Sequence, residues 1–578
     1  MTAPIVGIDL GTTHSLVGAV IDGRMRLFSR PDGTTLLPSV VGVGLDGSVL
    51  VGREARNRRL LDPEGTVTSV KRRMGEDVRL RLGDRELSPP EISAQILAAL
   101  LDMAEAELGQ RPSKAVITVP AYFDEHQRQA TKDAGEIAGL EVARLVNEPT
   151  AAALTYETGQ EELVLVYDLG GGTFDVSVLE RDEGFMEVRA SHGDTRLGGD
   201  DLDAALTERV LETLGKRRAQ VEADPHAMTR LVEAVERAKI ELSSREATRI
   251  HEPFLTGEGP SVVNLDHELT RADVEEVAQP LLERTVACID TALGTAGVAA
   301  ADLDRVLLVG GASQMPRVAA LVEDHLDRPL QLAESPDRAV ALGAARLAGR
   351  MDGSDVDEIL VDITPFTLGA GVFARPEPGL VSSPVIARST VVPTEKTATY
   401  YTLWEDQEAV EVPVCQGEAH RFEDNTEIGE VTVADLPPSP EASPVDVVFR
   451  LDLSGVLHVS ATHRPSGQRA TATIAHGPQR LTEQHREEAR ALHRRMREPS
   501  STAPAASPAP DGAVSDGQLR LARSLIRRAE RALDGAGIDA PLRTRVTEAA
   551  AALQAAIDEG EGIAERTEAL TDALYDLD

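Results

Sequence analysis

The chain has 578 residues, enough for about three or four domains of ordinary size. Its formal net charge is −37, from 59 basic and 96 acidic residues, which argues against binding to nucleic acid or to anionic membranes, because both need basic patches. Cys288 and Cys415, far apart and without metal-ligand spacing, indicate a reducing compartment. Since neither a secretory signal nor a membrane-spanning apolar run is visible, we expect a cytoplasmic protein.

Residues 1–355 alternate short apolar runs with longer helical patterns, which predicts an α/β domain. Strands are expected at 5–10, 115–119, 164–167 and 306–309. The stretch Ser88-Pro-Pro-Glu predicts the start of a helix, because an N-cap residue precedes Pro and an acid lies in the first turn.

Two stretches of this first part resemble each other. IVGIDLGTTHS starts at Ile5 and VLVYDLGGGTFD starts at Val164, and both read as strand, Asp, Gly-rich turn, Thr and strand. Glycines weaken a strand, but they let several backbone N–H groups approach one phosphate. Each stretch alone could be an ordinary tight turn; the matched pair predicts a duplicated fold with a phosphate site in a cleft between its halves.

The residue types of these turns indicate a magnesium nucleotide. Backbone donors are expected from Gly11, Thr12 and Thr13 and from Gly170, Gly171 and Gly172. Carboxylates repel phosphate, so Asp9, Asp168 and Asp175 fit a hydrated Mg²⁺ that they hold through water. No GxxxxGK[ST] loop occurs, which disfavours a P-loop nucleotidase.

The later part of the chain has a different pattern of apolar and polar residues. An apolar trio between acids at 356–364 predicts an interdomain linker, and short strand patterns at 365–478 predict an all-β domain. A helix is expected at 479–498, a flexible Pro/Ala/Ser-rich linker at 499–516 and a helical lid or bundle at 517–578. The interdomain linker at 356–364 could instead be a strand of the β domain.

Several motifs, taken together and in order, resemble the DnaK-type heat-shock chaperones. They include GIDLGTTHS, ITVPAYFDEHQRQATKDAG, NEPTAAALTYE, YDLGGGTFD, GDTRLGGDD and LLVGGASQMP, followed by DITPFTLGA and GVLHVSA in the later part. The short β domain and reduced tail look most like the HscC branch. The resemblance implies an actin-like (duplicated ribonuclease-H-like) ATPase domain, a β-sandwich peptide-binding domain and a short α-helical lid.

The resemblance also implies roles for individual residues. Lys71 would lie beside the γ-phosphate, Glu148 would order water around the metal, and Thr173 would bond the γ-phosphate or the attacking water; Asp168 completes this catalytic set. Further contacts to ATP are implied for Gly198, Gly199, Glu236, Lys239, Ser243, Gly310, Gly311, Ala312 and Asp337. Without the resemblance, Lys71 reads as surface charge and the stripe Glu236, Lys239, Ser243 as a solvated helix face.

Three positions depart from the family pattern. They are His14, Arg196 and Gln314, and Gln314 stands where an Arg often stacks on adenine. None removes a proposed metal or phosphate partner, so we expect ATP hydrolysis with Mg²⁺, and K⁺ as a possible second ion, but no particular rate or affinity.

In the β domain, the resemblance implies a groove for extended apolar segments of unfolded proteins. Its pocket would be formed by Ala370, Phe373, Tyr400, Leu403, Val410 and Val412, although ordinary core residues would look the same. We expect the helical tail to cover the groove partly and ATP hydrolysis to switch the groove from low to high affinity. A J-domain co-chaperone and a nucleotide-exchange factor are implied by resemblance only.

Three other functions fit parts of the sequence. A small-metabolite kinase or a filament-forming relative of the same actin-like fold has no use for the β domain and the helical tail. A non-hydrolysing scaffold with a chaperone's shape is disfavoured by the presence of Lys71, Asp168 and Thr173.

Overall fold

The computed structural model describes residues 4–575, except for 157–161, 183–184, 258, 333–334, 354–358, 375–378, 474–482, 498–521, 524, 528, 530–532, 534–539 and 560–561. The predicted flexible linker 499–516 and part of the predicted interdomain linker lie outside the described residues.

The first half of the chain forms two lobes, each built on a sheet with the same topology. In lobe I, the strand order is β10 (Glu141–Asn147), β9 (Lys114–Val119), β1 (Val6–Asp9), β2 (His14–Ile21) and β3 (Arg24–Leu27), with β4 (Leu37–Pro38) paired to β2. In lobe II, it is β17 (Leu330–Leu332), β16 (Arg305–Val309), β11 (Glu162–Leu169), β12 (Phe174–Asp182) and β13 (Phe185–Asp194). In both sheets an antiparallel three-strand meander is extended by two parallel strands, and this repeat explains why the two sequence stretches match.

Helices cover these sheets and complete the lobes. Lobe I contains α1 (Arg53–Arg59), α2 (Pro89–Leu108), α3 (Glu125–Ile137) and α4 (Glu148–Ala153), with the hairpins β5 (Val41–Val43)–β6 (Val49–Val51) and β7 (Leu80–Leu82)–β8 (Arg85–Leu87). Lobe II contains α5 (Gly199–Thr213), α6 (Arg218–Glu222), α7 (Pro225–Leu242), α8 (Arg271–Ala296) and α9 (Pro316–Leu326), with the hairpin β14 (Ala247–Thr256)–β15 (Val263–Thr270). Helix α10 (Ala339–Met351) packs against β1, β2 and α4 and so returns the chain to lobe I.

The predicted start of α2 is confirmed. Ser88 and Glu91 form a capping box, in which the Ser88 N–H donates to Glu91 Oε2 at 2.8 Å, and prolines occupy the first turn. The helix ends at Gly109, whose φ of 72° is the left-handed conformation that favours glycine.

The β domain is a sandwich of two four-stranded sheets. One sheet has the order β20 (Leu380–Ile386), β19 (Leu368–Phe373), β23 (Val410–Gln416), β24 (Thr426–Val433). The other has the order β22 (Thr394–Tyr401), β25 (Pro444–Leu451), β26 (Leu457–His463), β27 (Arg469–Thr473). Valines and leucines from both sheets form one buried core between them, as alternating strands require.

The linker strand β18 (Ile359–Ile363) joins the two domains. It pairs in parallel with β13 of lobe II, and its end pairs antiparallel with β21 (Val391–Val392) of the β domain. The apolar trio of the predicted linker is therefore part of the lobe II sheet in this conformation.

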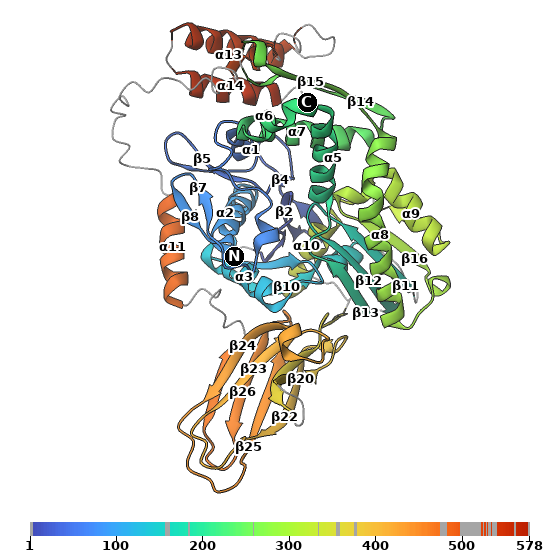
Figure 1. Cartoon of the computed structure of the whole chain (residues 1–578), viewed down its shortest axis with the longest axis vertical. Coiled ribbons are helices and arrows are strands. Elements are labelled where there is room, and N and C mark those ends of the chain that lie inside the picture. Colours follow the sequence, from blue (N-terminus) through green and yellow to red (C-terminus); the bar gives the residue numbers. More distant parts are fainter. Residues whose placement is uncertain are drawn as a thin grey trace.

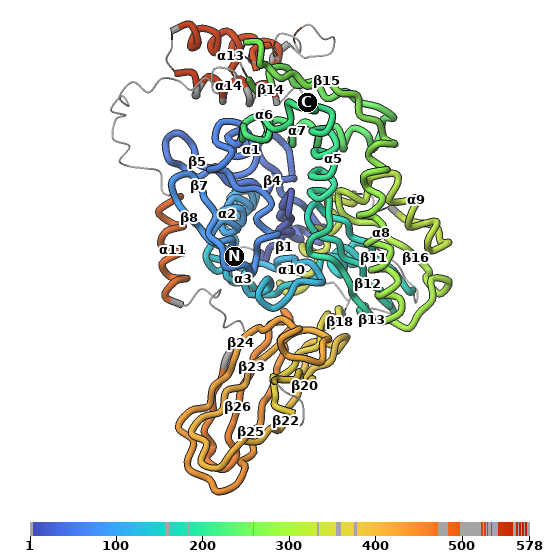
Figure 2. The backbone as a smooth tube through the Cα atoms, in the orientation of Figure 1, coloured from blue at the N-terminus to red at the C-terminus, as the bar shows by residue number. Residues whose placement is uncertain are grey.

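The described part of the helical tail lies against the two lobes, not over the β-sandwich. Helix α11 (Glu483–Arg497) packs on α2 and α3, and α14 (Ile563–Tyr575), which forms a hairpin with α13 (Ala540–Glu559), contacts α1. Figures 1 and 2 show α13 and α14 at the end of the molecule opposite to the β domain. The expectation that the tail partly covers the groove is therefore not met by the described tail in this conformation.

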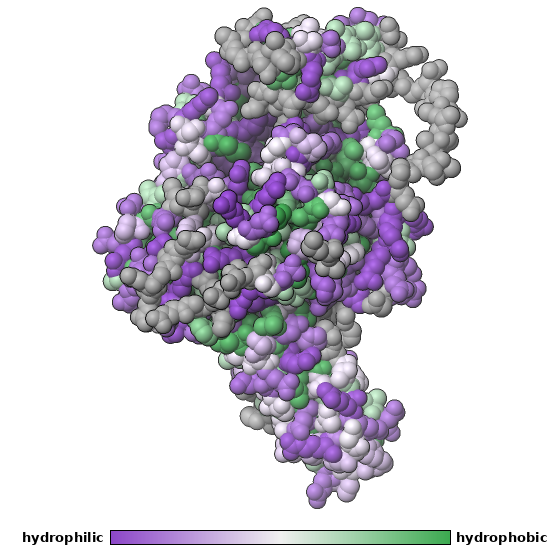
Figure 3. All heavy atoms as spheres, turned by 180° about the vertical axis from the view of Figure 1, so that it is seen from behind, coloured by the Kyte–Doolittle hydropathy of each residue, from purple (hydrophilic) through white to green (hydrophobic). Residues whose placement is uncertain are grey.

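Figure 3 shows a surface dominated by hydrophilic residues, with only small apolar areas between them, as the acidic composition leads one to expect. Within the described ranges, every helix is too short or too polar to cross a lipid bilayer.

Candidate functional site

A cavity of about 450 Å³ lies between the two lobes. Most of the residues predicted to contact a metal or nucleotide line it: Asp9, Gly11, Thr12, Thr13, Lys71, Glu148, Asp168, Gly170, Gly171, Thr173, Gly199, Glu236, Lys239, Ser243, Gly310, Gly311, Ala312 and Asp337. They come from both repeats, from α7 and from the segment just before α10, so only the folded chain brings them together. Gly172, Gly198 and Asp175 do not line the cavity, and their surroundings show why.

The two glycine-rich turns touch each other. A Cβ atom at Gly171 would overlap Thr13 Oγ1, and one at Gly172 would lie 2.7 Å from Thr12 Cγ2. At Gly198 a Cβ would lie 2.5 Å from the Gly171 carbonyl oxygen. Gly172 and Gly198 are therefore needed for the close packing that brings both turns to one cavity. The predicted phosphate donors are not all free in this conformation: the Gly170 N–H donates to the Thr173 carbonyl at 3.0 Å, and the Gly199 N–H donates to the Gly170 carbonyl at 3.0 Å.

Four carboxylates and the buried Lys71 ammonium gather at the floor of the cavity; those of Asp9, Glu148 and Asp168 line it, and that of Asp175 lies behind them. Lys71 Nζ pairs with Glu148 Oε1, while Thr118 Oγ1 donates to Asp9 Oδ1 at 2.9 Å. Burial, and next the negative charge of Glu148, raise the pKa of Asp9 and of Asp175 to about 7, and the same causes raise the pKa of Asp168. This excess of buried negative charge over Lys71 alone favours binding of a further cation.

The donor set fits a hydrated magnesium ion. Within the described ranges no three His, Cys, Asp or Glu side chains converge closely enough to hold a metal directly, which is compatible with carboxylates that act through water. Asp175 lies behind the cavity, 2 % exposed, where its Oδ1 accepts a hydrogen bond of 3.0 Å from the Tyr122 N–H. Its carboxylate thus connects the acidic floor to the loop before α3.

The opposite wall of the cavity comes from α7 and from the turn after β16. Glu236 Oε2 accepts from Arg56 Nη2 of lobe I at 2.6 Å, and Lys239 Nζ pairs with Asp203 Oδ2 at 2.8 Å. Gly310 has a φ of 85°, and a Cβ there would lie 2.6 Å from Asp168 Oδ1. The stripe Glu236, Lys239, Ser243 is therefore a wall of the cavity and not simply a solvated face.

Some lining residues were missed by sequence reasoning. Two are the acids Asp200 and Asp203, which follow the Gly-Gly pair on α5, and burial raises the pKa of Asp203 to about 6. The others are apolar side chains: Leu16, Leu36, Leu202, Ile240, Met315, Pro336 and Val340. Asp200 was visible in GGDD, but neither Asp203 nor the apolar wall residues carry a sequence signal that marks them as part of a site.

The three departures from the family pattern lie in different places. His14 and Gln314 line the cavity, and burial together with Arg56 lowers the pKa of His14. Arg196 is outside it, with a side chain 76 % exposed beside Glu76.

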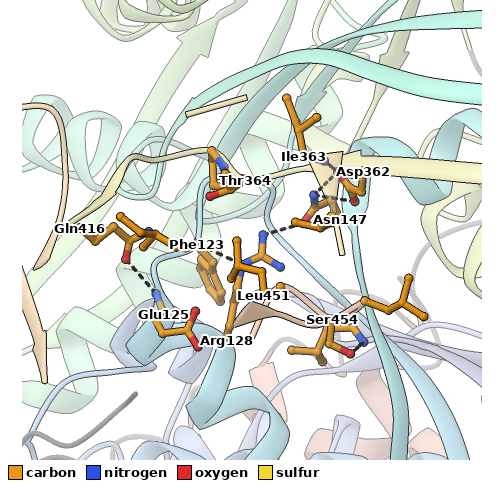
Figure 4. Close-up of a pocket in the computed structure, with 16 residues that line it drawn as sticks. Phe123, Glu125, Arg128, Asn147, Asp362, Ile363, Thr364, Gln416, Leu451 and Ser454 are labelled. Carbon is orange, nitrogen blue, oxygen red and sulfur yellow. Dashed lines mark hydrogen bonds between the residues drawn. The ribbon is translucent and has the colours of Figure 1, made fainter. Parts of the chain in front are cut away.

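A second cluster lies where lobe I meets the linker and the β domain (Figure 4). Asn147 Nδ2 donates to both carboxylate oxygens of Asp362 in β18, at 2.9 and 2.8 Å. Asn147 Oδ1 accepts from Arg128 Nη2 at 2.7 Å. Asn147 immediately precedes Glu148, so one peptide bond separates the acidic floor of the cavity from the side chain that holds the linker.

The β domain itself is bonded to the start of α3. Glu125 Oε1 accepts from the Leu457 N–H at 2.8 Å, and the Glu125 N–H donates to Gln416 Oε1 at 3.1 Å. Burial raises the pKa of Glu125 to about 8. In addition, the rings of Tyr122 and Phe366 lie 4.5 Å apart between their centroids.

The predicted peptide-pocket residues divide into three groups. Ala370 and Val412 are buried in the sandwich core, and Tyr400 and Val410 are partly buried against it. Phe373 and Leu403 are exposed, at 59 % and 49 %. Ala370 and Val412 are therefore core residues in this conformation, while Phe373 and Leu403, like Tyr401 and Trp404, expose apolar side chains to solvent.

Comparison with known families gives one match that spans nearly the whole chain. The family model described as Hsp70 protein matches residues 5–81 and 76–577. It covers both lobes, the linker, the β-sandwich and the helical tail. The chain belongs to the Hsp70 family.

Proposed function

We propose that this chaperone of the Hsp70 kind binds and hydrolyses ATP in the cavity between its lobes and uses the reaction to change its hold on extended apolar peptide. The contact between the two glycine-rich turns, over a floor of buried carboxylates and Lys71, carries the proposal. Members of the Hsp70 family are ATPases, and most of the residues to which we assign a part in that activity line this cavity.

Each side chain has a role that follows from its place. Lys71 and Glu148 form a buried ion pair, so Lys71 can hold the attacking water and offset charge that develops on the terminal phosphate. Asp9, Glu148 and Asp168 would hold a hydrated magnesium ion through water, with Asp175 behind them, and Thr173 would bond a terminal phosphate oxygen. Magnesium, when bound, would supply positive charge that offsets part of the charge of the phosphates.

The coupling to peptide would run through the linker strand. A nucleotide that moves Glu148 also moves Asn147, its neighbour, and Asn147 holds Asp362 of β18. The domain-docked conformation described here is the form that we assign to low peptide affinity. Release of β18 from β13 would free the β domain and raise the affinity.

The peptide would bind at the exposed apolar side chains Phe373, Leu403 and Trp404. Their exposure of 49–60 % in a domain with a well-packed core suits them to contact an extended chain. Trp404 is the single tryptophan of the chain. Peptide binding should therefore change the intrinsic tryptophan emission, and Trp404→Phe should remove this change.

The decisive experiment on the ATPase is Lys71→Ala. We expect nucleotide binding to persist and turnover to fall by about 100-fold or more, the usual effect of removing a group that stabilises transition-state charge. Lys114→Ala is the matched control, because Lys114 is an exposed lysine of the same lobe, paired with Glu141. Turnover that survives in the Lys71 variant would refute the catalytic assignment.

Peptide-stimulated turnover separates the chaperone from its rivals. We expect ATP turnover to rise when an unstructured apolar peptide is added. A flat response would favour a scaffold or a small-metabolite kinase. The HscC branch, the J-domain co-chaperone and the exchange factor remain predictions from the resemblance.

A further inference from the structure

The C-terminal helices form a small body with its own core. Helices α13 and α14 and the described residues between 522 and 533, which are helical, share the buried side chains Ala522, Leu525, Val546, Leu553, Leu570 and Leu574. This C-terminal bundle, residues 522–575, rests on the lobes at the end away from the β domain (Figures 1 and 2).

The bundle touches lobe I through the end of α1. Leu60 and Leu61 pack against its core, and α14 contacts α1. The same helix α1 carries Arg56, which is 2.6 Å from Glu236 in the wall of the cavity.

The bundle touches lobe II through Phe254. The Arg527 guanidinium lies 3.9 Å from the centroid of the Phe254 ring. Phe254 sits in an irregularity of the β14–β15 pairing with a φ of 53°, which is an uncommon conformation for a bulky residue. Its N–H donates to Asn264 Oδ1 at 2.7 Å and its carbonyl accepts from Arg230 Nη1 at 3.1 Å, so the backbone holds the residue in this conformation.

The two contact points face each other across the place where the lobes meet. His226 of lobe II lies 3.0 Å, through Nδ1, from the Leu60 carbonyl oxygen of lobe I. If the lobes move apart to release a nucleotide held between them, that movement would carry Leu60 and Leu61 away from Phe254. A body attached to both sides opposes the movement.

We propose that the C-terminal bundle is a clasp that joins the two lobes and slows nucleotide release. The inference rests on the proposed nucleotide site. Separation of the lobes must break either the Arg527–Phe254 contact or the packing on Leu60 and Leu61. Loss of one cation–π contact corresponds to a release rate about 2- to 30-fold higher.

The test uses the full-length chain loaded with a fluorescent ADP analogue and chased with excess ATP in a stopped-flow instrument. Phe254→Ala and Arg527→Ala should each raise the dissociation rate by about 2- to 30-fold. The double variant should release no faster than the faster single variant, because both substitutions remove one contact. Release rates equal to that of the unchanged chain would overturn the clasp.

A second pair of variants tests the lobe I side. Leu61→Glu should also speed release, whereas Leu45→Glu, at a leucine of the same lobe that is 57 % exposed and outside the bundle's core, should not. Equal effects of the two would overturn the clasp. If the unchanged chain bound no nucleotide analogue at all, the proposed function would fail instead. Melting curves identify any variant that does not fold. If Leu61→Glu does not fold, the release rates of the Phe254→Ala and Arg527→Ala variants decide whether the bundle acts as a clasp.

Discussion

Glu125 is a single carboxyl group buried where lobe I meets the β-sandwich. It is 3 % exposed and bonded to the Leu457 N–H. Burial raises its pKa from an ordinary 4.5 to about 8, while Arg128 opposes the shift and Asp452 and Asp124 add to it. When the domains separate, the carboxyl group becomes exposed and its pKa returns toward the ordinary value.

Docking of the β domain should therefore depend on pH. The docked form binds the proton more tightly, so docking is most favourable below about pH 4.5 and weakens as the pH rises toward 8. The slope is at most about 1.4 kcal/mol per pH unit. Energy transfer between dyes on lobe I and on the β domain, followed across this range, measures the docked fraction.

Glu125→Gln keeps an acceptor for the Leu457 N–H but cannot ionise. In this variant the pH dependence over the same range should be lost while docking persists. Glu141→Gln is the matched control, because Glu141 belongs to the same lobe and its side chain is 64 % exposed. If the Glu125→Gln variant keeps the full pH dependence of docking, a group other than Glu125 is responsible for that dependence.

At the scale of elements, the linker strand β18 is held by its pairing with β13 and by one carboxylate, that of Asp362. Asp362 is 7 % exposed and lies near Arg128 as well as Asn147. Because hydrogen bonds to buried charged groups contribute about 1.5–3 kcal/mol, this contact is large enough to decide whether the strand stays docked.

Asn147→Ala should release the linker without removing any proposed nucleotide contact. We expect faster hydrogen exchange of the Ile359–Ile363 amides and a smaller effect of nucleotide on peptide affinity. Asp362→Ala should act in the same way, and the double variant should add little to either single one, because the two side chains share one contact. Additive effects would show that the pair does not couple the domains.

The two matched turns predict the part of the cavity that they form, whereas Lys71, Glu148 and the residues of α7 were named only through the family resemblance. The start of α2 was predicted from an N-cap residue before Pro and an acid in the first turn. Glu125 and Asn147 were not revealed as interdomain contacts, since a buried polar side chain looks the same in the sequence as a solvated one. Ala370 and Val412 were named for the peptide pocket although they are buried, because core and pocket residues share the same composition and alternation.

The position of the helical tail could not be predicted either, and the reason is different. An amphipathic helix requires an apolar partner but does not specify which one. Helix α11 carries Arg486 and Arg490, which pair with Asp133 and Glu136 of α3, at 3.3 Å in each case. This charge match fixes α11 on lobe I, and it becomes visible only when α3 is folded.

At the scale of the whole molecule, the nucleotide cavity and the exposed apolar side chains of the β domain are linked by the strand β18 and by the interface between lobe I and the β-sandwich. Glu148, Asn147 and Asp362 form a continuous path, and Asp175, Tyr122 and Phe366 form a second. Both paths start at the acidic floor and end at or just beyond β18. A change at the floor can therefore bias docking of the whole β domain, as allosteric coupling requires.

The coupling predicts that ATP weakens peptide binding relative to ADP by about 5- to 150-fold, the range of a typical coupling free energy. The reason is that the docked form fixes β18 and the interface around Glu125, so peptide binding that favours separation must overcome those contacts.

Anisotropy of a dye-labelled extended apolar peptide measures the two affinities, and Trp404 emission shows that the peptide reaches the β domain. By reciprocity, the peptide must weaken ATP binding relative to ADP binding by the same factor. The Asn147→Ala variant should bring the two peptide affinities closer together. If the unchanged chain binds peptide equally well with either nucleotide, the two sites are not coupled, and the contacts at Asn147 and Glu125 serve only to hold the domains together.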